Sequence, residues 1–484
     1  MALAVPEVSP RSYWLDEALV ADPGGPCPPL RGRVEADVCI AGGGFVGLWT
    51  AYELTEREPS LDIVLLEADI CGAGGSGANG GFFSSSWTDL TFLCRVFGEA
   101  AGVRYATALG DEVAALGKWV ARHEATIDFH HEGILYARAG EWQAGPDRET
   151  FALLAANGLG VRLYEVDAGE ARRVAHSPRF AGGVVTPDQA TVQPARLARE
   201  LRRVLLERGV RIFEGTPLRD VRPGDPAGVE TPAGHVRAGR VVLAVGAWGV
   251  TLPRYRRAFA VATDFMVVTE PIPELLQQIG WTTHRGIADR REMLYYLRRT
   301  EDDRIAIGGG ALGVVFGGRI RGRAVTSRRL AEVAAAGLVW LFPALEGVRF
   351  THAWSGPMDL TPPGLPFFHT WPQGNVHAGL GFSGHGLVPT RVGGKTLASL
   401  ALGADDQWSC LPVVGPPLLR VPPEPLRWPL VGLAAWAVER GDRAQQRGRR
   451  RGHTARAAGA AMDLYAARAH RAHARRRTGE PSGR

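Results

Sequence analysis

One stretch of the chain, residues 36–67, constrains the fold more than any other. It runs from an apolar segment through a glycine-rich turn and a helical segment to a second apolar segment that ends at Glu67. Gly42, Gly44 and Gly47 give the turn the GxGxxG spacing. In this motif the first glycine allows a tight turn, the second lets the backbone approach a pyrophosphate, and the third lets helix and strand pack closely. The stretch therefore predicts a strand, turn, helix and strand that bind a dinucleotide.

The residues beside this turn predict how the dinucleotide is held. The helical segment begins at Phe45 and Val46, so backbone N–H groups at its positive end face the phosphates. Glu67 lies twenty residues beyond Gly47, where a carboxylate can accept hydrogen bonds from an adenosine ribose. We therefore expect Phe45, Val46, Glu67 and the adjacent Ala68 to contact the cofactor together with the motif glycines.

A second glycine-rich loop follows over residues 68–81, and its six glycines leave almost no side-chain bulk. Such a loop can lie against a flat ring, with Ser76, Asn79 and backbone N–H groups bonding the phosphates and the edge of an isoalloxazine or nicotinamide. The alternative is a flexible linker, but linkers rarely lie next to a nucleotide-binding unit with Asn and Ser held between paired glycines. We expect these loop residues to bind the cofactor: Gly75, Ser76, Asn79, Gly80 and Gly81.

Two later segments are expected to return to the same cofactor. The apolar segment Val241 to Trp248 predicts a buried parallel strand that ends in small residues, which places Gly246 and Trp248 near the cofactor. A second strand is predicted over residues 375–380, and a helix over residues 387–402 aims its positive end at the turn between them. That turn supplies the remaining predicted cofactor contacts: Gly381, Ser383, Gly384, His385 and Gly386.

Three residues are candidates for catalysis. His385 could act as an acid, a base or a positive charge near the ring, although glycine-flanked histidines also serve simply as hydrogen-bonding turn residues. In the predicted strand over residues 293–298, the period of two places Tyr296 and Arg298 on one face. A Tyr and an Arg could together fix a substrate carboxylate, with Arg forming a bidentate pair. The alternative is a surface Arg beside a core Tyr.

The composition limits the other classes of function. The chain has 484 residues, 45% hydrophobic and 22% charged, which is typical of a globular protein with two or three domains. Its net charge of +6 arises from a tail in which Arg440 to Arg484 holds thirteen Arg and three acidic residues. Because Tyr465 is the only aromatic residue there, we expect a solvated extension rather than a nucleic-acid site.

Cysteines, histidines and apolar runs predict neither a metal nor a membrane. The five cysteines are widely spaced and lack a CxxC pair, so neither a disulfide framework nor a zinc site is expected. His123, His130 and His131 form no familiar ligand spacing with nearby acids, so we expect no metal site. The N-terminus lacks a signal pattern, and the uncharged run Trp428 to Val438 is about half of the ~20 residues that span a bilayer. We expect a cytoplasmic protein, and its oligomeric state stays open.

Together these segments resemble the flavoprotein family of the D-amino acid oxidase and glycerol-3-phosphate dehydrogenase type, especially its gamma-glutamylputrescine oxidoreductase-like, amine-oxidising branch. The resemblance covers residues 10–440. It rests on the Gly42 turn with Glu67 and on these further segments: Ser76 to Gly81, Val241 to Trp248, Ala353 to Gly356 with Asp359, and Gly381 to Gly386. It implies FAD and an α/β fold, with a discontinuous Rossmann-like FAD-binding domain and a mixed-sheet α+β substrate domain.

The corresponding expected boundaries begin with an irregular N-terminal arm over residues 1–35, which Trp14 could pin. The FAD-binding domain takes residues 36–90, 185–250 and 350–405, and the substrate domain takes residues 91–184 and 251–349. A C-terminal packing segment is expected over residues 406–440, followed by the Arg-rich tail over residues 441–484.

The resemblance also implies an activity. An amine or amino acid substrate would lose a hydride from carbon to flavin N5, the imine would hydrolyse, and oxygen or another acceptor would reoxidise the flavin. The chain departs from that branch at Ala78, where Arg is usual, and offers only Lys118 and Lys395 where some relatives use a lysine beside the ring. Two alternatives remain: an NAD(P)H-dependent flavin hydroxylase or carrier-linked dehydrogenase, and a flavin-binding protein without amine turnover.

Overall fold

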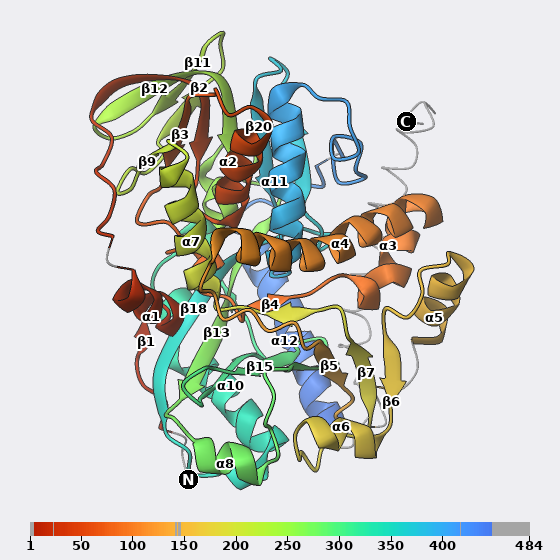
Figure 1. The fold of residues 1–484 in the computed structure, drawn as a ribbon. Coiled ribbons are helices and arrows are strands. Elements are labelled where there is room, and N and C mark those ends of the chain that lie inside the picture. The colour runs from red at the N-terminus through yellow and green to blue at the C-terminus, as the bar shows by residue number, and fades with distance from the viewer. Residues whose placement is uncertain (1–3, 23, 141–142, 144–146, 417, 448–484) are drawn as a thin grey trace.

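The computed structural model of the chain describes residues 4–22, 24–140, 143, 147–416 and 418–447. It is built on two large sheets, which lie one above the other in Figure 1 with the helix α4 (Glu99–His123) crossing between them. Most of the predicted Arg-rich tail, residues 448–484, lies outside the described residues. None of the helices in the described ranges combines the length and the apolar character that crossing a membrane requires.

The eight-stranded sheet contains the predicted nucleotide unit. Its order is β10-β11-β12-β2-β3-β9, with β20 on the other side of β12 and β19 beside β20. The strands are β2 (Gly32–Ala41), β3 (Ile63–Leu66), β9 (Arg211–Phe213), β10 (Asp220–Arg222), β11 (Ala227–Glu230), β12 (Gly234–Leu243), β19 (Phe367–Thr370) and β20 (Val376–Leu380). The strands β9, β3, β2, β12 and β20 run parallel, so their carboxyl ends meet at one edge.

Helices cover one face of this sheet. They are α2 (Phe45–Arg57), α7 (Pro194–Glu207) and α11 (Leu387–Leu402), and Figure 1 shows α2 and α11 side by side. The four residues Val38 to Ala41 of β2 are all buried, as expected of a parallel strand covered on both faces. The helix α11 has the bounds that the sequence predicted, with Pro389 in its first turn, where its missing N–H costs nothing.

The ten-stranded sheet is mixed. Its order is β1-β18-β13-β16-β15-β14-β5-β7-β6, with β17 also paired to β13. The strands are β1 (Val8–Ser9), β5 (Ile134–Ala137), β6 (Tyr164–Val166), β7 (Gly183–Thr186), β13 (Ala260–Thr269), β14 (Gly286–Asp289), β15 (Tyr295–Arg299), β16 (Ile305–Gly309), β17 (Gly313–Val314) and β18 (Phe350–Leu360). One face packs on α10 (Arg328–Leu341) through an apolar cluster that includes Tyr295 and Leu297.

Shorter elements connect the two sheets. A two-stranded ribbon pairs β4 (Phe82–Phe83) with β8 (Ala190–Thr191). The remaining helices are α1 (Tyr13–Ala21), α3 (Leu90–Phe97), α5 (Asp147–Ala156), α6 (Ala168–Val174), α8 (Pro273–Gln278), α9 (Arg323–Thr326) and α12 (Arg427–Gln446). Short 3-10 turns include η1 (Gly75–Gly77), η2 (Trp87–Asp89), η4 (Gly246–Thr251), η5 (Phe316–Gly318) and η6 (Pro343–Leu345).

The architecture confirms the predicted fold class, because a largely parallel sheet assembled from distant segments stands beside a larger mixed sheet. The segment boundaries proposed for the two domains stay a prediction. Within them, β18 pairs in the ten-stranded sheet although residues 350–405 were assigned to the FAD-binding domain, and the arm strand β1 pairs with β18.

The expectation of an irregular arm over residues 1–35 is wrong for its first half. The side chain of Ser12 accepts a hydrogen bond from Leu15 N–H and starts α1, while Trp14 on this helix is 1% exposed. Irregular backbone lies chiefly in residues 24–31, between α1 and β2. Trp14 does fix the arm, as predicted.

Candidate active site

The first glycine turn is closed by direct contact between backbones. Gly42 has a φ of +115°, and a Cβ atom there would lie 2.2 Å from the carbonyl oxygen of Ala244 at the end of β12. A Cβ atom at Gly47 would lie 1.9 Å from the carbonyl oxygen of Gly42. Both positions therefore require glycine, and the close packing of β2, α2 and β12 depends on them.

Polar groups surround the start of α2. The N–H of Phe45 donates to Ser76 Oγ at 2.9 Å, and the first turn of the helix carries no acidic residue. Glu67 accepts from Gly43 N–H at 2.7 Å and from Asp69 N–H at 2.9 Å. Burial raises the pKa of Glu67, and these two hydrogen bonds oppose the rise. A positive helix end without its own carboxylate is a favourable place for phosphate oxygens.

The second glycine loop is held rigidly against the body of the protein. The amide of Asn79 donates to the carbonyl oxygen of Ser76 at 2.6 Å and accepts from Gly81 N–H at 2.8 Å. Ser12 on the arm donates to the Gly77 carbonyl at 2.6 Å, and Trp354 on β18 donates to the Ala78 carbonyl at 2.9 Å. This many fixed contacts exclude the alternative of a flexible linker.

Trp248, a predicted cofactor contact, lies beside the second glycine loop. It follows Gly246, which has a φ of +49°, and its ring lies 3.4 Å from the position of a Cβ atom at Gly74. The Trp248 side chain is 45% exposed, unusual for an indole this close to the core. Ala68, by contrast, is an exposed residue of the connection after β3.

The second glycine turn, Gly381 to Gly386, is closed by a carboxylate. Asp359 on β18 accepts from the N–H groups of Gly381 at 2.5 Å and Phe382 at 3.1 Å, and burial raises its pKa to about 6. Ser383 has a left-handed φ of +54°, and its hydroxyl accepts from Thr361 N–H at 3.1 Å. The helix α11 begins directly after the turn without an acidic residue in its first turn.

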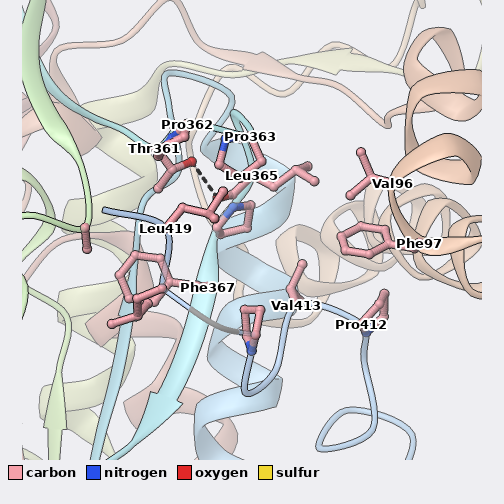
Figure 2. Close-up of a pocket in the computed structure, with 14 residues that line it drawn as sticks. Val96, Phe97, Thr361, Pro362, Pro363, Leu365, Phe367, Pro412, Val413 and Leu419 are labelled. Atoms are coloured by element: carbon pink, nitrogen blue, oxygen red, sulfur yellow. Dashed lines mark hydrogen bonds between the residues drawn. The ribbon is translucent and has the colours of Figure 1, made fainter. Parts of the chain in front are cut away.

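A small cavity lies behind this turn but does not suit amine chemistry. Figure 2 shows it between Thr361, Leu365 and Phe367 on one side and Val96 and Phe97 of α3 on the other. Its volume is about 60 Å³, and its lining residues are apolar except for Thr361. It therefore offers no charged group to a substrate.

His385 is an exposed residue at the rim of the second turn. Its N–H donates to the Phe382 carbonyl at 3.0 Å. Burial raises the pKa of Asp89, and the nearby charges of His385 and Arg290 lower it again. Asp89 is nonetheless exposed to solvent at the end of η2.

The face of the ten-stranded sheet opposite α10 forms a wall beside the second loop. Strand register places Tyr136, Ala288, Tyr296, Gly308 and Met266 in one row across five neighbouring strands. The structure brings Tyr296 and the loop together, because a Cβ atom at Gly80 would lie 2.5 Å from the Tyr296 ring. This contact between a predicted catalytic residue and a predicted cofactor residue was not visible in the sequence.

Asp264 on β13 completes this wall and was missed by the sequence reasoning. The hydroxyl of Tyr296 donates to its carboxylate at 2.5 Å, and Phe265 N–H donates to the other oxygen at 2.8 Å. No ion pair to Asp264 is found among the described residues. Burial raises its pKa to about 6. The available signal was a single acidic residue within a strand of otherwise small and apolar residues, Ala260 to Thr269.

Arg298 lies on the same face as Tyr296, as predicted, but is only 1% exposed. Its guanidinium donates to the Val192 carbonyl and lies 5.3 Å from the centre of the Trp14 ring. Burial lowers its pKa to about 10. A Cβ atom at Gly81 would lie 2.5 Å from its Nη1. In this structure a substrate carboxylate does not reach Arg298 unless the turn above it opens.

Both lysines of the chain lie away from this wall. Lys395 on α11 pairs with Glu112 and lies 4.5 Å from the centre of the Trp408 ring. Lys118 is an exposed residue of α4.

Comparison with known proteins identifies the family. The model of the family described as "FAD dependent oxidoreductase" (DAO) matches residues 37–400. The chain belongs to this family. FAD is its cofactor, and the protein is an FAD-dependent amine or amino acid oxidoreductase. The resemblance inferred from the sequence is thereby confirmed.

Several relatives match over most of their length. The chain is 26% identical to gamma-glutamylputrescine oxidoreductase of Escherichia coli over 421 residues, 85% of this chain and 95% of the relative. It is 27% identical to a probable oxidoreductase, OrdL, of Rhizobium meliloti over 419 residues, 84% of this chain and 91% of the relative. The fold is similar to the crystal structure of glycine oxidase from Geobacillus kaustophilus, with a TM-score of 0.62, 21% identity, and coverage of 80% of this chain and 99% of that one.

The residues of the two turns fit FAD. Gly42, Gly43 and Gly44 carry no side chains where a diphosphate would have to approach the backbone, and the positive ends of α2 and α11 lack acidic residues. The half-exposed Trp248 and the rigid loop at Gly74 to Gly81 provide flat surfaces for a ring. The assignment of individual residues to individual FAD atoms stays a prediction.

Proposed function

We propose that the protein oxidises the C–N bond of an amine or amino acid to an imine, which water then hydrolyses to a carbonyl compound and an amine or ammonia. The observation that carries this proposal is the Asp264 and Tyr296 pair on the sheet wall, in contact with the Gly80 loop. The pair places a carboxylate, which has no ionic partner in the described part of the chain, beside the loop expected to support the flavin.

The chemistry explains why such a pair is useful. An alkylamine is protonated at neutral pH, and only the neutral amine readily releases hydride from its α-carbon. The Asp264 carboxylate can hold the ammonium group, and with a pKa of about 6 it can take one proton from it. The hydroxyl of Tyr296 fixes the carboxylate in place. FAD, when bound, supplies the acceptor for the hydride.

Other predicted site residues have supporting roles in this proposal. Arg298 holds the Gly81 turn from beneath as a positioning residue, because its guanidinium is buried against Val192 and Trp14. The positive end of α11, next to His385, places favourable charge at the rim of the site, where negative charge would develop on a reduced ring.

The decisive experiment is anaerobic. The FAD-loaded protein is mixed with amino acids, N-methyl amino acids and polyamines in turn, and bleaching of its visible spectrum is recorded. Bleaching by one class supports amine oxidation, and admission of air then separates an oxidase from a dehydrogenase. Bleaching by NADPH without any amine would instead support the flavin hydroxylase, and a yellow protein that no amine bleaches would overturn the proposal.

The proposed role of the pair is tested by Asp264→Asn and Tyr296→Phe. Asp264→Asn removes the proton acceptor, so it should lower kcat/KM for the best amine by about 100-fold or more and remove the activity increase near pH 6. Tyr295→Phe is the matched control, because the Tyr295 hydroxyl donates to the Val333 carbonyl on the opposite face of the sheet. Equal losses in all three variants would contradict a special role for the pair.

A further inference from the structure

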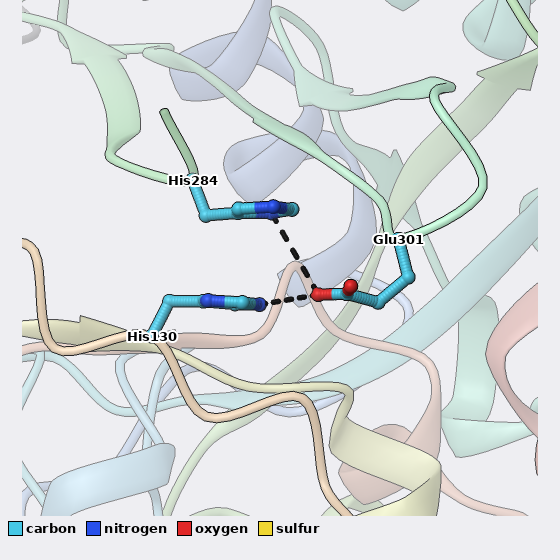
Figure 3. A group of neighbouring side chains, drawn as sticks. All are labelled: His130, His284 and Glu301. Atoms are coloured by element: carbon cyan, nitrogen blue, oxygen red, sulfur yellow. Dashed lines mark hydrogen bonds and ion pairs between the residues drawn. The ribbon is translucent and has the colours of Figure 1, made fainter. Parts of the chain in front are cut away.

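Away from the glycine turns, three potential metal ligands from distant parts of the chain meet where inner strands of the ten-stranded sheet begin or end. His130 precedes β5, His284 precedes β14, and Glu301 lies in the turn between β15 and β16. Figure 3 shows both imidazole rings extending toward the Glu301 carboxylate. His130 Nε2 lies 2.5 Å from Glu301 Oε1, and His284 Nδ1 lies 3.8 Å from the same oxygen.

We propose that His130, His284 and Glu301 bind one divalent metal ion and that the preferred ion is Zn²⁺. Their candidate ligand atoms all lie within 4.8 Å of one another, so small side-chain movements would place each about 2 Å from a common ion. The proposal is independent of the amine chemistry, since it concerns other residues and a different ligand.

The hydrogen bonding of the two histidines supports an ion between them and Glu301. The two rings stack, with their centroids 3.9 Å apart and an angle of 7° between their planes. Two positive charges in this arrangement would repel each other. His284 Nδ1 is buried, and none of the described residues hydrogen-bonds to it. A neutral imidazole with a free nitrogen is the form that binds a metal.

The surrounding residues fix the ligands in place. The His130 backbone pairs with Thr191, donating at 2.9 Å and accepting at 3.0 Å. Glu132 accepts from the backbone N–H of His284 at 3.1 Å and places its other carboxylate oxygen 4.0 Å from His130 Nδ1. At 4.0 Å this carboxylate lies near the far nitrogen of His130 but beyond hydrogen-bond range.

The set of donor atoms favours zinc over the hard cations. Two imidazole nitrogens and one carboxylate oxygen are typical ligands of Zn²⁺, whereas Mg²⁺ and Ca²⁺ prefer oxygen ligands. Glu301 is 48% exposed, so the ion can enter from solvent and a water molecule can complete its coordination. The ion would connect the start of β14 to the turn after β15 and so stabilise the sheet edge near the β4 and β8 ribbon.

This site escaped the sequence analysis for a geometric reason. The histidines considered there, His123, His130 and His131, are close in sequence but do not converge on one site. His123 contacts the Tyr52 hydroxyl at 3.1 Å, and the centre of the His131 ring lies 6.0 Å from that of Phe129. His130 instead meets His284, which only the parallel pairing of β5 and β14 brings beside it.

The test uses the full-length FAD-loaded protein after removal of metals with a chelator. Zn²⁺ is titrated by calorimetry, and bound zinc is counted by mass spectrometry after dialysis. We expect one equivalent bound to the wild type, a thermal midpoint raised by a few degrees, and tetrahedral absorption bands when Co²⁺ replaces zinc. Wild-type protein that retains no zinc at micromolar concentrations would overturn the proposal.

The matched variants are His284→Ala, Glu301→Gln and His131→Ala. The first two should weaken zinc binding at least 100-fold, whereas His131→Ala, which removes a neighbouring histidine outside the cluster, should bind as the wild type does. Because Glu301 is exposed, Glu301→Gln keeps the test decisive even if His284→Ala unfolds. Zinc binding that is equal in all variants would place the ion elsewhere and contradict the proposal. Flavin bleaching by amines, measured on the same samples, reports separately on the proposed function.

Discussion

The turns Gly42 to Gly47 and Gly381 to Gly386 each follow a parallel strand of the eight-stranded sheet and each lead into a helix whose first turn lacks an acidic residue. They are held in different ways. The first turn is closed by contacts between backbones, of which the nearest join Gly42 with Ala244 and Gly47 with Gly42. The second is closed by the Asp359 carboxylate, which accepts from two N–H groups of the turn.

The difference determines how each turn responds to change. A backbone contact has no protonation state and tolerates no added atom, so the first turn depends on shape alone. The carboxylate of Asp359 is a removable acceptor with a pKa of about 6, so the second turn also depends on charge and pH. Variants at each turn can show whether the two really behave differently.

The largest effect is expected at the first turn. Gly47→Val would place side-chain atoms within the space now filled by the Gly42 carbonyl, and the backbone cannot yield without separating α2 from β2. We expect loss of bound FAD, measured by absorbance, and a free energy of unfolding lower by several kcal/mol. Gly25→Ala is the control, since a Cβ atom there meets nothing within 4 Å. Normal FAD content in Gly47→Val would show that the turn is not closed by shape.

An intermediate effect that depends on pH is expected at the second turn. Because the folded pKa of Asp359 is raised above its unfolded value, the unfolded state ionises first as pH rises, and this residue loses up to about 3 kcal/mol of stability between about pH 4 and pH 6. Asp359→Ala leaves two N–H groups without an acceptor and lacks that pH dependence. Its deficit in the free energy of unfolding of the apoprotein should therefore be larger at pH 5 than at pH 8 in urea titrations.

A deficit that does not vary with pH would show that Asp359 is not buried as a protonated acid at pH 5. The variant Asp302→Ala serves as a control for the assay, because hydrogen bonds from Thr300, Arg304 and Tyr13 outweigh burial and hold the pKa of Asp302 below its usual value. For that residue stability should be lost as pH falls, which is the opposite sign.

The sequence predicted the first turn better than the second and the wall least well, for physical reasons. The Gly42 turn, α2 and Glu67 lie within one local unit, so spacing alone specifies their arrangement. The bounds of α11 followed from local periodicity in the same way. The acceptor of the second turn comes from β18, however, and its role depends on a strand pairing that no local pattern specifies.

The same limit applies to the wall. Period-two alternation placed Tyr296 and Arg298 on one face, but it could not give the depth of Arg298 beneath Gly81. Asp264 meets Tyr296 only because β16 lies between β13 and β15 in the sheet. The hydrogen bond that caps the start of α1 joins residues close in sequence, so it could have been predicted from Ser12.

The smallest effect is expected at the contact between the first turn and the second loop. Ser76 Oγ accepts from Phe45 N–H, the group that a phosphate oxygen could also bond. Ser76→Ala should lower the free energy of unfolding of the apoprotein by about 1 kcal/mol, because one hydrogen bond is lost. If FAD phosphate takes over this N–H, the loss should largely disappear in the FAD-loaded protein, measured as the difference in thermal midpoint. Ser355→Ala, which removes a hydroxyl that donates to the Val325 carbonyl away from the turn, should lose the same amount with or without FAD. An equal loss for Ser76→Ala in both forms would mean that Ser76 keeps this bond when FAD is bound, and that the helix end is closed by the protein itself.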